Sequence, residues 1–157
     1  MSKGEKVFLS MIVRALSFWR GVHMDSEELA KYWMETAEKD YITMRNLYET
    51  GDYHWALFMG HLVLEKLLKA CYVKMMEEHA PRVHDLLRLA NLCKLEFGDE
   101  MADYLDMITT FNINARYPDL KQAFYKKCTQ EFADQNITKI EEVRAWLNDV
   151  LQITPEK

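Results

Sequence analysis

The stretch Trp55-Ala-Leu-Phe-Met-Gly-His-Leu-Val-Leu-Glu-Lys-Leu-Leu-Lys-Ala70 decides the fold that we expect for this chain. On a helical wheel with about 100° per residue, apolar side chains cover most of its circumference. Only a narrow stripe is polar, and it consists of His54, His61, Glu65 and Lys69. A helix that is apolar on nearly every side is buried on several sides. We therefore expect residues 53–78 to form the central helix of a bundle, a dimer contact, or both.

Helical spacing of apolar residues continues on both sides of this segment, and no strand pattern interrupts it. We expect further helices over residues 25–50, 83–96 and 99–116, and a last helix that begins near Thr129 or Thr138. Because a residue before proline avoids the α region, Tyr117-Pro118 should end one helix near Arg116. Short connections between long helices predict an all-α, up-and-down antiparallel bundle of four to five helices.

The chain of 157 residues is long enough for one domain with a buried core. We expect residues 24–157 to be that domain, with a capping box of Asp25 and Glu28 at the start of its first helix. Residues 1–23 are interpreted as an N-terminal arm or a non-native extension. Their apolar part is interrupted by Arg14 and is too short to span a bilayer. We therefore expect a cytoplasmic protein without a membrane anchor.

The net charge and the spacing of the cysteines limit the functions that this sequence can have. The formal net charge is −5, with acidic and basic residues interspersed. This pattern argues against a broad, sequence-independent DNA-binding surface, but it leaves room for a local basic pocket. Cys71, Cys93 and Cys128 are widely spaced among apolar residues and lack the spacing of zinc ligands. We expect reduced cysteines in the core, and we expect no cofactor.

The clearest candidate site is the element Arg116-Tyr-Pro-Asp119. Its guanidinium and carboxylate are three residues apart at a rigid helix exit, where they can hold a phosphate or a carboxylate group. The same two side chains can instead form an ion pair that closes the turn. Both interpretations remain open at this point.

A metal site on the central helix is the less favoured interpretation of its polar stripe. His61 and Glu65 lie one turn apart, which is a spacing that can hold a metal ion. However, Lys69 lies on the next turn, and a glutamate four residues before a lysine favours an internal ion pair. We therefore expect a Glu65–Lys69 pair and no metal.

Three motifs in order resemble the HEPN domain family. They are the Glu65-Lys66-x-x-Lys69-Ala element of the central helix, then His84-Asp-Leu86, then Arg116-Tyr-Pro-Asp119. Their order and spacing match the family over about residues 25–152. The resemblance implies a helical bundle that forms a homodimer. It also implies pairing with a minimal nucleotidyltransferase in a two-gene, toxin–antitoxin arrangement.

The resemblance also implies a way of cleaving RNA, from which this chain departs. Many family members are metal-independent ribonucleases that use an arginine followed, after four to six residues, by a histidine. At those distances Arg116 is followed by Lys121, Gln122 and Ala123, and no histidine occurs after His84. Of the two catalytic residues of these ribonucleases, only the arginine has a counterpart in this chain, which is Arg116. His84 is a candidate substitute for the proton-transfer group, although it can equally cap its own helix, and Lys121 or Tyr125 could supply a cation or a phenol.

Three functional hypotheses therefore remain. The preferred one is a dimeric partner of a nucleotidyltransferase that binds a nucleotide or RNA, with Arg116 holding a phosphate and Asp119 orienting it. Its secondary ligand-binding candidates are Tyr117, Glu65, Lys66 and Lys69. The second hypothesis is a metal-independent endoribonuclease with a substituted general base, for which Arg116 and His84 are the catalytic candidates. The third is a purely structural dimerisation module in which Arg116 and Asp119 form an internal clamp.

Overall fold

The computed structural model describes residues 25–153, and these form six helices. They are α2 (Ser26–Glu49), α3 (Tyr53–Met76), α4 (Leu86–Leu92), α5 (Asp99–Asn114), α6 (Pro118–Lys127) and α7 (Gln130–Ile153). No strand occurs within residues 25–153, so the expected all-α class is confirmed. The arm expected over residues 1–23 lies outside the described residues.

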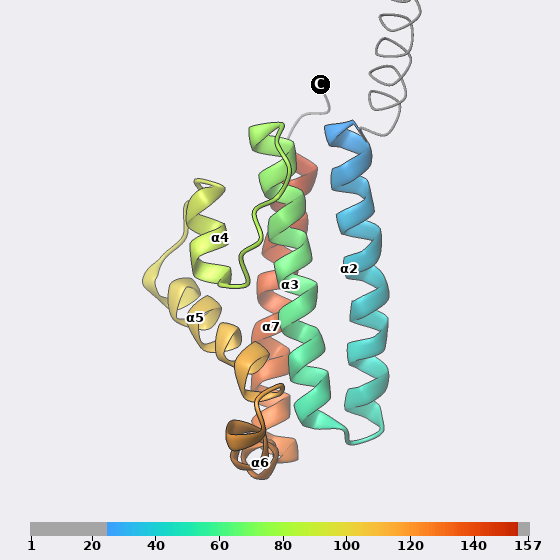
Figure 1. The fold of residues 1–157 in the computed structure, drawn as a ribbon, viewed down its shortest axis with the longest axis vertical. Coiled ribbons are helices and arrows are strands. Elements are labelled where there is room, and N and C mark those ends of the chain that lie inside the picture. Colours follow the sequence, from blue (N-terminus) through green and yellow to red (C-terminus); the bar gives the residue numbers. More distant parts are fainter. Residues whose placement is uncertain (1–24, 154–157) are drawn as a thin grey trace, which may run out of the picture.

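The four longer helices α2, α3, α5 and α7 run in alternating directions, as Figure 1 shows. α2 lies beside α3 on one flank, α4 and α5 lie on the other flank, and α7 packs behind α3 in this view. α6 crosses the end of the bundle at which α3 and α7 begin. This arrangement confirms the predicted up-and-down antiparallel bundle. None of the helices within the described residues is long and apolar enough to cross a bilayer.

α3 is the central helix, because it contacts each of the other five described helices. Its buried apolar positions lie on several sides of the helix and include Ala56, Leu57, Val63, Leu64, Leu67 and Leu68. The wheel of this segment therefore predicted its place in the bundle correctly. The alternative that it also forms a dimer contact stays a prediction.

Gly60 determines how closely α3 approaches α7 and α2. A Cβ atom at this position would lie 2.4 Å from Cδ1 of Ile140 and 3.2 Å from Sδ of Met44. Ile140 on α7 and Met44 on α2 are both fully buried. Three helices therefore meet at Gly60, and any side chain there would force the core to repack.

The start of α2 differs from the expected capping box. Asp25 is the N-cap residue, but its carboxylate accepts no hydrogen bond from the backbone of the helix. Instead, Oγ of Ser26 donates to Asp25 at 3.4 Å. The acidic side chains of Glu27 and Glu28 lie in the first turn, where a negative charge is favourable beside the helix dipole.

α4 is shorter than the helix expected over residues 83–96. It begins after Asp85, whose carboxylate accepts a hydrogen bond of 2.8 Å from the backbone N–H of Arg88. It ends before Lys94, which has a left-handed backbone with φ of 53°. Consequently His84 lies on the connecting segment (residues 77–85) and not in the helix.

The sequence pattern did not indicate α6, because Pro118 was interpreted only as the end of the preceding helix. Tyr117 has an extended backbone and is the N-cap of α6, and Pro118 occupies its first turn, where the missing N–H costs nothing. Asp119 in the first turn and Lys126 and Lys127 in the last turn complement the helix dipole. The proline therefore ends one helix and begins another.

The start of α7 agrees with one of the two positions expected for the last helix. Oγ1 of Thr129 accepts a hydrogen bond of 3.2 Å from the backbone N–H of Phe132, which caps the helix. Thr138, the other expected position, lies inside α7.

The three cysteines are buried and free, as expected. Burial raises the pKa of Cys71 and of Cys93 to about 12, and that of Cys128 to about 11. Thiols with such pKa values are poor nucleophiles at neutral pH. They fill the core and supply no chemistry to a site.

Replacing Gly60 by Ala should lower the free energy of unfolding by about 1–3 kcal/mol, because the added methyl group overpacks a rigid core. Equilibrium unfolding in urea measures the change. Gly98→Ala is the matched control, since a Cβ added at Gly98 would meet no neighbouring side chain within 4 Å. Equal destabilisation by both substitutions would contradict the close approach of α3 and α7.

Candidate functional site

His61, Glu65 and Lys69 form a polar row on one face of α3, each one turn after the last. The row is buried, since Glu65 is only 6% exposed and Lys69 only 7%. Nζ of Lys69 donates to Oε1 of Glu65 at 2.6 Å, so the predicted ion pair is present. Unpaired charges in such a place would be strongly destabilising, so the pairing is a requirement of the fold.

His84 is the second partner of Glu65, and it comes from the connecting segment. Its Nδ1 lies 3.1 Å from both carboxylate oxygens of Glu65. Because the carboxylate can only accept, Nδ1 carries the proton and donates. The imidazole is otherwise well exposed, with 58% of its side chain accessible. Nε2 therefore has no hydrogen-bond partner among the described residues and faces solvent.

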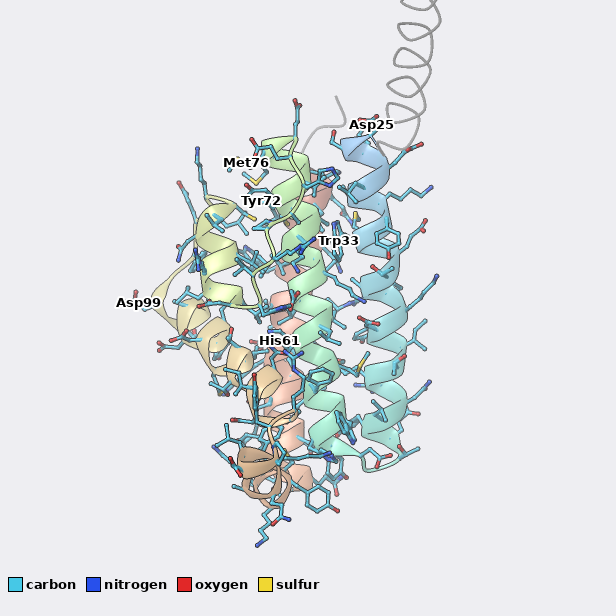
Figure 2. All side chains as sticks on the ribbon, viewed as in Figure 1. Asp25, Trp33, His61, Tyr72, Met76 and Asp99 are labelled. Carbon is cyan, nitrogen blue, oxygen red and sulfur yellow. The ribbon has the colours of Figure 1, made fainter. Side chains whose placement is uncertain are left out.

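His61 forms a hydrogen bond with the backbone of His84. Its Nε2 lies 2.8 Å from the carbonyl oxygen of His84, so Nε2 is the donor. The other ring nitrogen, Nδ1, is buried and has no hydrogen-bond partner within residues 25–153. Burial lowers the pKa of His61, which keeps the ring neutral at pH 7. Figure 2 shows His61 where α3 meets the segment that leads into α4.

The charge of Glu65 is set by a competition between burial and hydrogen bonding. Burial alone would raise its pKa, but the hydrogen bonds from Lys69 and His84 outweigh burial and lower the pKa of Glu65. Glu65 is thus ionised at neutral pH. An ionised carboxylate bound to Nδ1 of an imidazole fixes the ring orientation and its tautomer.

Lys69 also joins the row to α2. Its Nζ lies 5.4 Å from the ring centroid of Trp33, within the range of a cation–π contact. Figure 2 shows Trp33 on the side of α2 that faces α3. Both contacts of Lys69, with Glu65 and with Trp33, lie inside the bundle. Lys69 is therefore a structural residue and is not available to a ligand.

Arg116 lies just after α5, and its guanidinium is oriented by Asn112, one turn earlier. Nε of Arg116 donates to the carbonyl oxygen of Asn112 at 3.1 Å, and Nη2 donates to Oδ1 of Asn112 at 2.6 Å. Asn112 is 5% exposed, whereas Arg116 is an exposed residue. Two of the five guanidinium N–H groups are used in this way, and the other three have no hydrogen-bond partner among the described residues.

Arg116 and His84 lie against the same face of α3. The guanidinium of Arg116 is 5.8 Å from the ring centroid of Phe58, and His84 contacts Glu65, seven residues or two turns further along α3. With a rise of about 1.5 Å per residue, these contacts are about 10 Å apart along the helix axis. The structure therefore places the two residues proposed as catalytic from the sequence on the same side of α3, with their contacts two helical turns apart.

α5 also links the segment that contains His84 to the position of Arg116. Oγ1 of Thr109 on α5 accepts a hydrogen bond of 3.0 Å from the backbone N–H of Leu86, two residues after His84. Arg116 follows the end of α5, seven residues after Thr109. The start of α4 and the end of α5 are thus fixed relative to each other and to α3.

Positive charge and aromatic rings extend from Arg116 onto α6. This helix contains three lysines and one aspartate, in a chain whose net charge is −5. Nζ of Lys121 lies 4.8 Å from the ring centroid of Trp55, and Tyr125, which is 63% exposed, contacts His54 edge-on at 5.0 Å. Lys121, Gln122, Tyr125 and Lys126 line a shallow groove on this helix.

Two of the other predicted site residues lie elsewhere or are used differently. Lys66 forms an ion pair with Asp40 of α2, away from the polar row. No ion pair joins Arg116 to Asp119 in the described part of the chain, so the predicted clamp is absent. Asp119 instead serves the first turn of α6, and Tyr117 is exposed beside Arg116.

Asn112 is the site residue that sequence reasoning missed. Its signal is its position four residues before Arg116, which places the two side chains on one face of a helix. No group of three histidine, cysteine or acidic side chains that could hold a metal ion comes together within residues 25–153.

These features define a helical-bundle domain with a buried polar row on its central helix. The chain belongs to the HEPN domain family, which it matches over residues 30–150. The protein TT1696 from Thermus thermophilus has a similar structure, with a TM-score of 0.65 and 21% sequence identity. The similarity covers 77% of this chain and 97% of TT1696, and at this identity it shows the fold alone. The comparison with curated proteins gives no match.

Replacing Glu65 by Gln should destabilise the protein at neutral pH and should flatten the pH dependence of its stability. Because the pKa of Glu65 lies below its ordinary value of 4.5 in the folded protein, ionised Glu65 stabilises the fold above that pH. This contribution is lost as the pH falls through the lowered pKa. The difference in unfolding free energy between wild type and variant should therefore shrink on acidification.

Urea unfolding at a series of pH values measures this difference. Glu96→Gln is the control, since Glu96 is exposed and lies outside the helices. A wild-type advantage over Glu65→Gln that stays constant from pH 7 to about pH 3 would contradict the ionised pair.

Proposed function

We propose that this HEPN-domain protein binds the phosphate of a nucleotide or of RNA at the corner between α5 and α6 (residues 115–117). The observation that carries the proposal is the orientation of Arg116 by buried Asn112, which leaves three guanidinium N–H groups without a hydrogen-bond partner among the described residues. A guanidinium that is held in place matches the oxygens of a phosphate and loses little entropy on binding. Tyr117 is the adjacent candidate for contact with the same ligand.

The surroundings of Arg116 favour a nucleic acid or a nucleotide over a simple anion. Lysines of α6 add positive charge next to the arginine, and exposed Tyr125 adds an aromatic face beside His54. Bases stack on such rings while cations bind the backbone phosphates. The absence of an Arg116–Asp119 pair within the described residues also removes the main support for a purely structural clamp.

We further propose that the protein works as a homodimer and as one component of a two-gene, toxin–antitoxin system with a minimal nucleotidyltransferase. Exposed apolar side chains occur close to Arg116 in the sequence, namely Ile113, Tyr117 and Leu120. A surface of this kind suits a protein contact that covers or releases a ligand site. If the adjacent gene encodes a minimal nucleotidyltransferase, coexpression of the two chains tests the partner: they should copurify, and separate elution in low salt would contradict the pairing.

Replacing Arg116 by Ala should weaken binding of a fluorescent single-stranded RNA by about tenfold to a hundredfold, because charge-assisted hydrogen bonds are lost. Fluorescence anisotropy at fixed salt measures the dissociation constant. Arg116→Lys should recover only part of the affinity, since lysine keeps the charge but not the planar fork. Arg88→Ala removes an exposed arginine of α4 and serves as the control.

A different pattern would favour the structural hypothesis. If Arg116→Ala lowers the melting temperature while neither protein binds RNA or AMP, the arginine stabilises the bundle and the proposed binding function is wrong. If Arg88→Ala weakens binding as much as Arg116→Ala, the interaction is non-specific attraction to positive charge.

A further inference from the structure

His54 is the one member of the polar stripe of α3 that lies outside the buried row of His61, Glu65 and Lys69. It is the second residue of α3, two turns before His61, and it is 8% exposed. No hydrogen bond joins either of its ring nitrogens to another described residue. A histidine that is buried in this way, without a hydrogen-bond partner, is sensitive to its own protonation.

The neighbours of His54 are aromatic rings and the side chains of α6. The imidazole packs at a tilt against Trp55, with 5.1 Å between ring centroids, and Tyr125 of α6 contacts it edge-on at 5.0 Å. Lys121 lies one turn before Tyr125 on α6, and its Nζ is 4.8 Å from the ring centroid of Trp55. α6 therefore places both an aromatic ring and a positive charge beside His54.

α6 has few other anchors in the bundle. Phe124 is the one buried residue among its ten, and this ring stacks on Phe111 of α5 with 5.5 Å between centroids. A segment that buries little apolar surface opens at a low free-energy cost. The contacts of Tyr125 and Lys121 with the first turn of α3 are consequently a substantial part of what holds α6 across the end of the bundle (Figure 1).

Protonation of His54 acts against these contacts. Burial lowers the pKa of His54 below its ordinary value of 6.5, the positive charge of Lys121 lowers it further, and the carboxylate of Asp52 opposes both. When α6 moves away, water reaches the ring and Lys121 leaves with the helix, so a proton binds more readily. As the pH falls through 6.5 toward the lowered pKa, the docked position of α6 therefore loses stability relative to the undocked one.

We propose that α6 is a proton-sensitive element, whose docking on α3 is weakened when His54 takes up a proton. Its consequence for ligand binding rests on the proposed function of Arg116. α6 begins two residues after Arg116 and contains Lys121 and Lys126, which line the groove on this helix. Release of α6 displaces these lysines from the proposed phosphate site, so RNA affinity falls on acidification.

The coupling between His54 and α6 is reciprocal, so it can be measured at either end. Titration of the histidine rings of the full chain by NMR, from pH 5 to pH 8, should show that His54 titrates below 6.5. Tyr125→Ala removes the ring that covers His54, and Lys121→Ala removes the adjacent charge. Each of these substitutions should raise the pKa of His54. Tyr32→Ala removes an exposed tyrosine of α2 and should leave the pKa unchanged.

Amide hydrogen exchange over residues 118–127 measures the docking of α6. After correction for the intrinsic exchange rate, opening should increase from pH 7.5 to pH 5.5 by up to about tenfold per pH unit, since one proton is taken up. His54→Phe keeps an aromatic ring against Tyr125 but has no proton to bind, so this pH dependence should disappear. His79→Gln changes an exposed histidine and should keep the wild-type response. Unchanged protection of α3 shows that each variant is folded.

Two results would overturn the inference. One is a His54 that titrates at or above pH 6.5 in the wild type, and the other is a pH dependence of α6 that His54→Phe leaves unchanged.

Fluorescence anisotropy with single-stranded RNA at pH 7.5 and pH 5.5 tests the consequence for binding. Acidification should weaken RNA binding by wild type more than by His54→Phe. An equal response of both proteins would contradict control of the site by His54. If α6 opens on acidification but neither protein binds RNA at either pH, the proposed function is wrong and the proton-sensitive docking stands.

Discussion

The buried carboxylate of Glu65 is the constraint on which the arrangement of this bundle depends. A charge that is 6% exposed on the central helix must be compensated, and it is compensated by Lys69 within α3 and by His84 from the connecting segment. The second contact ties residues 77–85 to α3, which places the start of α4. The hydrogen bond between Leu86 and Thr109 then extends the same constraint to α5 and to the arginine that follows it.

Arg116 shows how a local helix geometry prepares a side chain for binding. One of the two interpretations of the sequence paired the arginine with Asp119, but that carboxylate lies in the first turn of α6, where the helix dipole favours it. Asn112, one turn before Arg116, supplies two acceptors that hold the guanidinium without neutralising its charge. The result is a positive charge, oriented by a neutral partner and next to a lysine-rich helix, in a protein that is negative overall.

Much of the fold was predictable from the sequence, because the spacing of apolar residues indicates which face of each helix is buried. The wheel of residues 53–78 identified the central helix, and the Glu65–Lys69 pair followed from a spacing of one turn. The sequence analysis did not predict α6, because proline can both end one helix and occupy the first turn of the next, and Pro118 does both. The contact of His84 with Glu65, and the contact of Arg116 with Phe58 on the same side of α3, arise from packing between segments far apart in the chain, which the periodicity of apolar residues does not indicate.

The central claim is that Arg116, oriented by Asn112, binds the phosphate group of a nucleotide. Nitrogen-15 NMR of the arginine Nε atoms during titration with a ribodinucleotide tests it most directly. We predict that the resonance of Arg116 Nε shifts and saturates with one dissociation constant, while that of exposed Arg88 on α4 does not respond. An Arg116 resonance that stays unchanged, or an equal response of Arg88, would contradict binding at Arg116.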